Sequence, residues 1–214
     1  MKSRLVLLGP PASGKGTLAE ALHNRFGWPV ASPGAMLRAE KAAGTALGLE
    51  ADKLTRHGQL IGDTIINQVV SMWLSHEALE GFIFDGYPRT IGQADALDAM
   101  LTARGCKLDA AILLEASIET LHQRVERRGT CADCGAIVSL GLHIQNFSDR
   151  CPRCGGTLSR RADDNAETLE RRLAEYRDKT LPVAGYYEKR GLLQRVPTER
   201  SEFEVFSSVL QMLN

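Results

Sequence analysis

The sequence predicts an α/β fold: a parallel sheet flanked on both faces by helices. Four apolar runs have the length and residue types of buried strands: Leu5–Leu8, Phe82–Phe84, Ala111–Leu114 and Leu192–Val196. Trp28–Val30 is a weaker candidate. Helical patterns cover Lys15–Phe26, Ile61–Leu74, Ile91–Arg104, Ile118–Arg128, Glu167–Tyr187 and Ser201–Leu213. Strands that alternate with helices in this way form parallel sheets, because a crossover helix returns the chain to the edge where the next strand begins.

Two stretches interrupt this alternation. Residues 32–61 are rich in Gly and Ala and predict helices without a strand, whereas residues 128–162 combine four cysteines with glycines and short β-like pieces. The total length of 214 residues suits one α/β domain with small insertions. We therefore expect a core of residues 1–31, 62–127 and 163–214 that carries both stretches as insertions.

The overall charge and hydropathy exclude some classes of protein. Lys plus Arg and Asp plus Glu both number 26, which argues against a protein whose main task is to grip nucleic acid. The apolar runs are far shorter than the roughly 18 residues of a membrane span. The run after Lys2 and Arg4 is also too short for a signal peptide, so we expect a cytoplasmic protein with reduced cysteines.

The segment Gly9–Thr17, which reads G-P-P-A-S-G-K-G-T, follows the first strand and opens the first helix. A glycine-rich loop in this position binds phosphate through its backbone N–H groups and the helix N-terminus. Lys15 supplies a charge for the β- and γ-phosphates, and the Thr17 hydroxyl is placed to meet a magnesium ion. The residues expected to hold a nucleoside triphosphate are Gly9, Ala12, Ser13, Gly14, Lys15, Gly16 and Thr17.

Four cysteines form two C-x2-C motifs: Cys131 with Cys134, and Cys151 with Cys154. Sixteen residues separate Cys134 from Cys151. This spacing predicts a structural four-thiolate zinc site, although iron or cobalt also suits four sulfurs. Disulfides and a redox-active C-x-x-C pair are the alternatives, which a reducing compartment and the doubled motif disfavour. The isolated Cys106 is expected to be a small core or loop residue.

A second polar segment, Asp85-Gly86-Tyr87-Pro88-Arg89-Thr90, follows another apolar strand. Asp85 is expected at the carboxyl edge of the sheet beside the phosphate loop, where a carboxylate orients the water molecules of a bound magnesium ion. A turn or helix-capping role is the alternative for Asp85. Arg89 presents a guanidinium fork that suits a phosphate.

Taken together, the phosphate loop, the D-G-Y-P-R-T segment with Gln93 close behind it, and the four-cysteine insertion resemble the zinc-lid bacterial type of the adenylate kinase family. The resemblance covers essentially the whole chain. It implies reversible, magnesium-dependent phosphoryl transfer from ATP to AMP, giving two ADP, in adenine nucleotide homeostasis. It also implies a cytoplasmic monomer without nucleic-acid or membrane partners, in which residues 32–61 close over AMP and residues 128–162 over ATP.

The same resemblance implies the roles of individual residues. The catalytic set is Lys15, Asp85, Arg89, Arg128, Arg161 and Arg172. Beyond the phosphate loop, the ATP contacts are Arg124, Arg128, Ile137 and Val138. The AMP contacts are Ser32, Pro33, Arg38, Gln59, Leu60, Ile61, Gly86, Tyr87, Pro88, Arg89, Gln93, Arg161 and Arg172. Gln93 would read adenine, because a primary amide both donates and accepts. Arg124 and Arg128, four residues apart, are expected on one helix face.

The chain departs from the family pattern at a few positions. Pro33 and Ala35 stand where a threonine and an aspartate are usual, which removes a hydroxyl, a backbone donor and a carboxylate near the expected AMP site. Ala12 replaces a glycine, so it must accept the backbone geometry of the loop. The segment after Val196 lacks an Asp-Gly pair.

Three other functions remain as alternatives on the sequence alone. A kinase for UMP or CMP shares the phosphate loop, but Gln93 and the long cysteine insertion argue against it. A zinc-ribbon ATPase that binds nucleic acid is disfavoured by the zero net charge and by Phe147 being the sole aromatic residue of the insertion. A non-catalytic nucleotide sensor would not need the full set of arginines.

Overall fold

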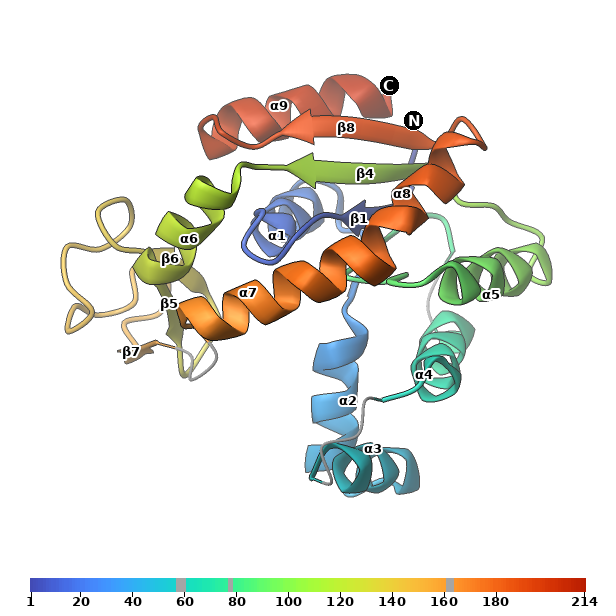
Figure 1. The fold of residues 1–214 in the computed structure, drawn as a ribbon, viewed down its shortest axis with the longest axis horizontal. Coiled ribbons are helices and arrows are strands. Elements are labelled where there is room, and N and C mark those ends of the chain that lie inside the picture. The colour runs from blue at the N-terminus through green and yellow to red at the C-terminus, as the bar shows by residue number, and fades with distance from the viewer. Residues whose placement is uncertain (57–60, 77–78, 161–163) are drawn as a thin grey trace.

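The structure, a computed structural model, describes residues 1–56, 61–76, 79–160 and 164–214 (Figure 1). A five-stranded parallel sheet has the order β2-β3-β1-β4-β8. Its strands are β2 (Val30–Ala31), β3 (Phe82–Asp85), β1 (Arg4–Leu8), β4 (Ala110–Glu115) and β8 (Leu193–Pro197). The predicted α/β class is therefore confirmed, and the weak strand candidate lies one to two residues later than expected.

Helices cover both faces of this sheet, which explains the continuous apolar character of its strands. In β1, Leu5 and Leu7 point to the face covered by α1 (Lys15–Phe26) and α9 (Glu202–Leu213). Val6 and Leu8 point to the opposite face. That face packs against α4 (Asp63–His76), α5 (Ile91–Thr102) and α8 (Leu181–Glu188). The alternation follows from the two-residue period of a strand.

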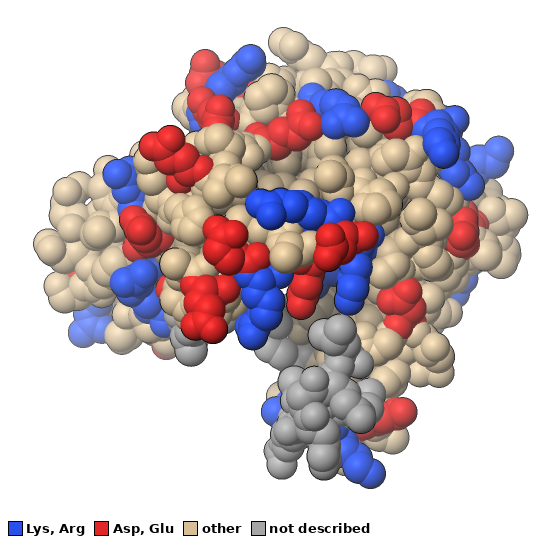
Figure 2. Space-filling view, in the orientation of Figure 1, with Lys and Arg blue, Asp and Glu red and all other residues tan. Residues whose placement is uncertain are grey.

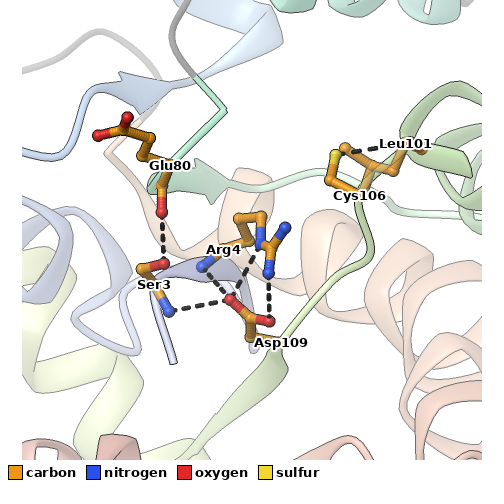
Figure 3. Close-up of polar contacts among 6 residues, drawn as sticks. All are labelled: Ser3, Arg4, Glu80, Leu101, Cys106 and Asp109. Carbon is orange, nitrogen blue, oxygen red and sulfur yellow. Dashed lines mark hydrogen bonds and ion pairs between the residues drawn. The ribbon is translucent and has the colours of Figure 1, made fainter. Parts of the chain in front are cut away.

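At the amino ends of the strands, the carboxylate of Asp109 links the start of β1 to the start of β4. Asp109 Oδ2 accepts hydrogen bonds from the backbone N–H groups of Ser3 at 3.0 Å and Arg4 at 2.9 Å, and the Arg4 guanidinium donates to both Asp109 oxygens (Figure 3). Burial tends to raise the pKa of Asp109, but the hydrogen bonds from Arg4 and Ser3 outweigh it and lower that pKa. The contact fixes the start of β1 against the start of β4, opposite the edge where the phosphate loop emerges.

The stretch expected as an insertion after β2 forms α2 (Pro33–Ala42) and α3 (Ala46–Arg56), as its pattern predicted. The two helices project from the sheet beside α4 (Figure 1). Ser32 precedes α2, and Pro33 occupies its first turn, where a missing N–H costs no hydrogen bond.

The cysteine-rich stretch forms a separate antiparallel sheet in the order β6-β5-β7. Its strands are β6 (Ile137–Ser139), β5 (Arg128–Cys131) and β7 (Leu158–Ser159). A small core of its own contains Cys131, Val138, Ile144, Cys151 and Leu158. So small a core leaves the stretch dependent on another source of stability.

Several helix boundaries differ from the sequence prediction: α4 begins and ends two residues later than expected, and α5 ends two residues earlier. Two further differences have a visible local cause. α6 (Ile118–Arg127) ends one residue early, because Arg128 is already extended and begins β5. The helix predicted over Glu167–Tyr187 is divided into α7 (Ala166–Glu175), a π-helical turn (Tyr176–Thr180) and α8. Pro182 cannot donate a backbone hydrogen bond, and the Leu181 N–H instead reaches the Tyr176 carbonyl, five residues back.

Candidate functional site

The phosphate loop connects β1 to α1 and contains residues with positive φ. Glycine adopts such a φ readily, whereas alanine does so at a cost. Gly9 has φ of 145°, and a Cβ there would lie 2.7 Å from the Leu114 carbonyl oxygen. Ala12 has φ of 63°, a left-handed conformation that costs a non-glycine residue about 1–2 kcal/mol. The strain anticipated for Ala12 is therefore present, and it lies within the segment that would surround a phosphate.

Lys15 folds over this loop. Its Nζ donates hydrogen bonds to the carbonyl oxygens of Gly9 at 2.9 Å and Pro10 at 2.8 Å, and lies 3.4 Å from Ser13 Oγ. Burial lowers the pKa of Lys15 to about 8. An ammonium that has lost much of its hydration and stands at a helix N-terminus is well placed to bind an anion.

Four charged side chains lie close enough to shift the pKa of Lys15. Asp85 raises it, whereas Arg89, Arg172 and Arg128 lower it. Asp85 ends β3 beside β1, in register with Leu7, and its Oδ2 lies 3.7 Å from the position of a Cβ on Gly16. Residues from β3, the β3–α5 connection, β5 and α7 thus lie within electrostatic range of one loop. The position of Asp85 at the carboxyl edge of the sheet beside this loop is the one that the sequence predicted.

Arg128 and Arg124 do not share a helix face, so that part of the sequence prediction is wrong. Arg128 donates through Nε to Asp164 Oδ2 at 2.8 Å and through Nη2 to Oδ1. Arg124, on α6, donates to the Thr198 hydroxyl at 3.1 Å, to the Thr198 carbonyl and to the Ala12 carbonyl at 3.4 Å. Arg124 therefore ties α6 to the phosphate loop and to the segment after β8.

The β3–α5 connection is a network of hydrogen bonds. Arg89 is exposed, and its Nε donates to the Gly86 carbonyl at 2.8 Å. The Tyr87 hydroxyl donates to Asn67 Oδ1 at 2.8 Å beneath the connection, and a cis peptide bond joins Tyr87 to Pro88. Gln93 is buried, with its Oε1 accepting from the Arg89 N–H at 2.7 Å. The connection is thereby fixed next to the phosphate loop.

The four cysteine sulfurs lie within 4.8 Å of one another. The Sγ atoms of Cys131 and Cys154 are 3.5 Å apart, and those of Cys134 and Cys151 are 3.8 Å apart. A tetrahedral ion with sulfur bonds of about 2.3 Å requires edges of about 3.8 Å, so the cluster fits such an ion. A hydrogen bond from the backbone of Cys134 is the main cause that lowers the pKa of the Cys131 thiol to about 7. At Cys154 the backbone hydrogen bond of Gly156 is outweighed by hydrogen bonds with the neighbouring cysteines, which raise the pKa of that thiol.

The cysteine-containing stretch contacts the sheet domain beside the phosphate loop. Ile137 Cδ1 lies 3.6 Å from the position of a Cβ on Gly16. Arg153 forms an ion pair with Glu20 on α1. Val138, the neighbour of Ile137, is buried inside the small core of the stretch. Of this predicted pair, only Ile137 thus has its side chain toward the phosphate loop.

Several predicted site residues fall outside the part of the chain that is described. Gln59, Leu60 and Arg161 lie in the gaps, and the side chain of Arg38 on α2 is also outside it. Sequence reasoning assigned no role to Asp63 or Thr198, which bind Gln93 and Arg124. Asp63 could have been noticed as an acidic residue in the first turn of a helix, whereas Thr198 carried no signal.

Lys, Arg, Asp and Glu side chains are interspersed over the face shown in Figure 2, without a large area of one sign. This distribution agrees with the zero net charge of the sequence. Among the helices of the described residues, none combines the length and apolar character that crossing a membrane requires.

Comparison with known proteins gives one consistent result. The family model described as adenylate kinase matches residues 7–192. An adenylate kinase of Thermodesulfovibrio yellowstonii is 40% identical over 211 residues, covering 98% of both chains. One of Rhizobium rhizogenes is 45% identical with 90% of both chains covered, and one of Pseudothermotoga lettingae is 43% identical with 98% of this chain and 97% of the other covered. The chain belongs to the adenylate kinase family.

Proposed function

We propose that the chain transfers the terminal phosphoryl group of magnesium-bound ATP to AMP, reversibly, giving two ADP. The observation that carries this proposal is the convergence of Asp85, Arg89, Arg128 and Arg172 on Lys15 at the phosphate loop. Phosphoryl transfer needs positioning and charge compensation more than covalent help from the protein. Membership of the adenylate kinase family supports the choice of nucleotides.

On the donor side, Lys15 and the loop N–H groups from Gly9 to Thr17 hold the ATP phosphates. Asp85 and the Thr17 hydroxyl are suited to hold magnesium, partly through water, and the ion neutralises charge on the β- and γ-phosphates. We assign Arg124, Arg128, Ile137 and Val138 to the remainder of the ATP site. Ile137 is supported by its approach to Gly16, and Arg124 by its bonds to the loop and to Thr198.

On the acceptor side, Arg38 and Arg89 bind the AMP phosphate. Arg161 and Arg172 contact both the AMP phosphate and the phosphoryl group that is being transferred. Gln93 reads the adenine edge. We assign the nucleoside contacts to Ser32, Pro33, Gln59, Leu60, Ile61, Gly86, Tyr87 and Pro88. The fixed β3–α5 connection supports this assignment, because its network holds Arg89 and Gln93 in a single arrangement.

We further infer three parts: a core of residues 1–31, 62–127 and 163–214, an AMP-binding insertion of residues 32–61, and a lid of residues 128–162. The separate sheet and core of the lid support its identity as a unit. Closure of the lid would exclude water and so prevent hydrolysis of ATP. We also propose that the protein acts as a monomer on cytoplasmic nucleotides.

Zinc is the metal that we propose for Cys131, Cys134, Cys151 and Cys154. Four thiolates leave no open coordination position, so the ion would stabilise the lid without taking part in the reaction. The sulfur spacing and the small core of the lid support a structural role.

A coupled assay of ADP formation from ATP tests the proposed function, with AMP, UMP, CMP and GMP compared as acceptors. We expect AMP to be used at least about a hundredfold more efficiently than the others, in keeping with recognition of the base by hydrogen bonds. Equal rates with UMP or CMP would identify a different nucleoside monophosphate kinase. ATP hydrolysis that is independent of any acceptor would contradict a transferase.

A further inference from the structure

Asp63, the first residue of α4, binds two groups of the β3–α5 connection. Its Oδ1 accepts a hydrogen bond from Gln93 Nε2 at 2.6 Å, and its Oδ2 accepts one from the Thr90 hydroxyl at 2.6 Å. The oxygen of the Gln93 amide accepts from the Arg89 N–H at 2.7 Å. The amide is therefore held between a carboxylate on one helix and a backbone N–H in front of another.

These two partners determine which way the Gln93 amide faces. A backbone N–H only donates and an ionised carboxylate only accepts, so Oε1 must face Arg89 and Nε2 must face Asp63. The reversed amide would place donor against donor and acceptor against acceptor. Because Gln93 is 5% exposed, water could not readily repair such a mismatch.

The Thr90 hydroxyl strengthens this arrangement. It accepts a hydrogen bond from the Gln93 backbone N–H at 3.1 Å, as the N-cap of α5, and gives its own proton to Asp63. Both oxygens of Asp63 thus act as acceptors. Replacing either oxygen with an NH2 group would remove its hydrogen bond to Thr90 or to Gln93.

A fixed amide distinguishes two classes of purine. An amide oxygen has two acceptor positions and its nitrogen two donor positions, and each of the bonds above uses one. The remaining pair suits adenine, which presents an amino donor beside a ring-nitrogen acceptor. The 6-oxopurines present a carbonyl acceptor beside a ring N–H donor, the opposite order.

We propose that Asp63 is a positioning residue that makes the acceptor site selective for adenine over 6-oxopurine nucleotides, by preventing reversal of the Gln93 amide. This inference rests on the proposed function, in which Gln93 reads the acceptor base. Asp63 itself need not touch the nucleotide, since it acts through Gln93.

Asp63→Asn tests the proposal with AMP and IMP as acceptors. IMP carries the 6-oxopurine edge without the extra amino group of GMP. An asparagine that keeps its oxygen toward the Thr90 hydroxyl turns its NH2 toward Gln93. Each orientation of the Gln93 amide then satisfies one partner and faces a like group at the other, the introduced asparagine or the Arg89 N–H, so the preference for the original orientation is lost. We expect the ratio of kcat/KM for AMP to that for IMP to fall by about tenfold or more, with the KM for ATP unchanged.

Asp63→Ala provides a second variant, which removes the acceptor without introducing a donor. We expect a smaller fall in the ratio than with Asp63→Asn, and this variant decides the question if the first does not fold. Glu119→Gln is the matched control, because it removes an acidic side chain from the first turn of α6, far from Gln93 in sequence and contacts. It should leave the ratio unchanged.

The outcomes separate the inference from the proposed function. General damage to the site would lower kcat/KM for AMP and IMP by the same factor, and a folded Asp63 variant with the wild-type ratio overturns the role of Asp63. A wild-type protein that fails to phosphorylate AMP overturns the proposed function instead.

Discussion

Arg128, the first residue of β5, is paired through two hydrogen bonds with Asp164, which lies just beyond the far end of the cysteine-containing stretch. The side chains of Arg128 and Asp164 are 15% and 1% exposed. This largely buried ion pair therefore holds together the two points at which the stretch joins the rest of the chain. It also leaves Arg128 within electrostatic reach of Lys15.

The first prediction concerns this pair. Asp164→Ala leaves a desolvated guanidinium without its partner, which costs about 3–5 kcal/mol in comparable buried pairs. We expect thermal unfolding to shift downward by about 6–20 °C in calorimetry. His122→Gln breaks the exposed pair with Glu170 between α6 and α7 and should cost less than about 1 kcal/mol. Equal losses in the two variants would contradict the importance of burial at Asp164.

The second prediction concerns the charge of Lys15. Burial lowers its pKa to about 8, and only the protonated form can hold the ATP phosphates. Because kcat/KM reports the free enzyme, kcat/KM for ATP should be steady below this pKa and fall toward a tenfold loss per pH unit above it. Bound phosphates raise the pKa of Lys15, so kcat should decline at higher pH than kcat/KM. A kcat/KM that stays constant up to pH ~9.5 would exclude this role.

The third prediction concerns the cysteine cluster. Cys131→Ser should reduce the bound metal, measured by elemental analysis, and lower the temperature of thermal unfolding, because the cysteine-containing stretch lacks a large core of its own. Activity at low temperature should change less than stability. Cys106→Ser is the control, since Cys106 lies outside the cluster and bonds through Sγ to the Leu101 carbonyl. Full metal content in Cys131→Ser would reject Cys131 as a ligand.

The fourth prediction concerns Ala12. Its positive φ costs about 1–2 kcal/mol, whereas glycine in the unfolded chain costs about 0.4–1 kcal/mol in entropy. Ala12→Gly should therefore stabilise the protein by up to about 1.5 kcal/mol, seen as a small rise in denaturant midpoint. Ala174→Gly on the exposed side of α7 should have the opposite sign, because glycine weakens an ordinary helix. A loss of stability at Ala12 would mean that the loop does not hold this strain.

Much of the fold could be predicted because the strands are buried on both faces and their helices carry clear periodicity. The bounds of α1 match the expected range at both ends, and the four cysteines meet at the predicted site. The proximity of Lys15 and Asp85 could be predicted because β1 and β3 end at the same edge of the sheet.

The remaining features depend on contacts between distant residues. The end of α6 at Arg127 is set by the pairing of β5 with its neighbours, which the helical pattern of Ile118–Arg128 does not reveal. The π-helical turn before Pro182 is a local defect that leaves the apolar pattern intact. The bond between Asp63 and Gln93 joins residues thirty apart, and the sequence carried no sign of their pairing.

The central claim is that two nucleotides meet with their phosphates between Lys15 and Arg89. Calorimetric titration with a dinucleotide that joins two adenosines through five phosphates tests this claim most directly. We predict one tight site per chain, weakened about a hundredfold or more by Lys15→Ala and by Arg89→Ala, and unchanged by Arg127→Ala on the exposed side of α6. Absence of binding, or equal affinity in all four proteins, would contradict the account.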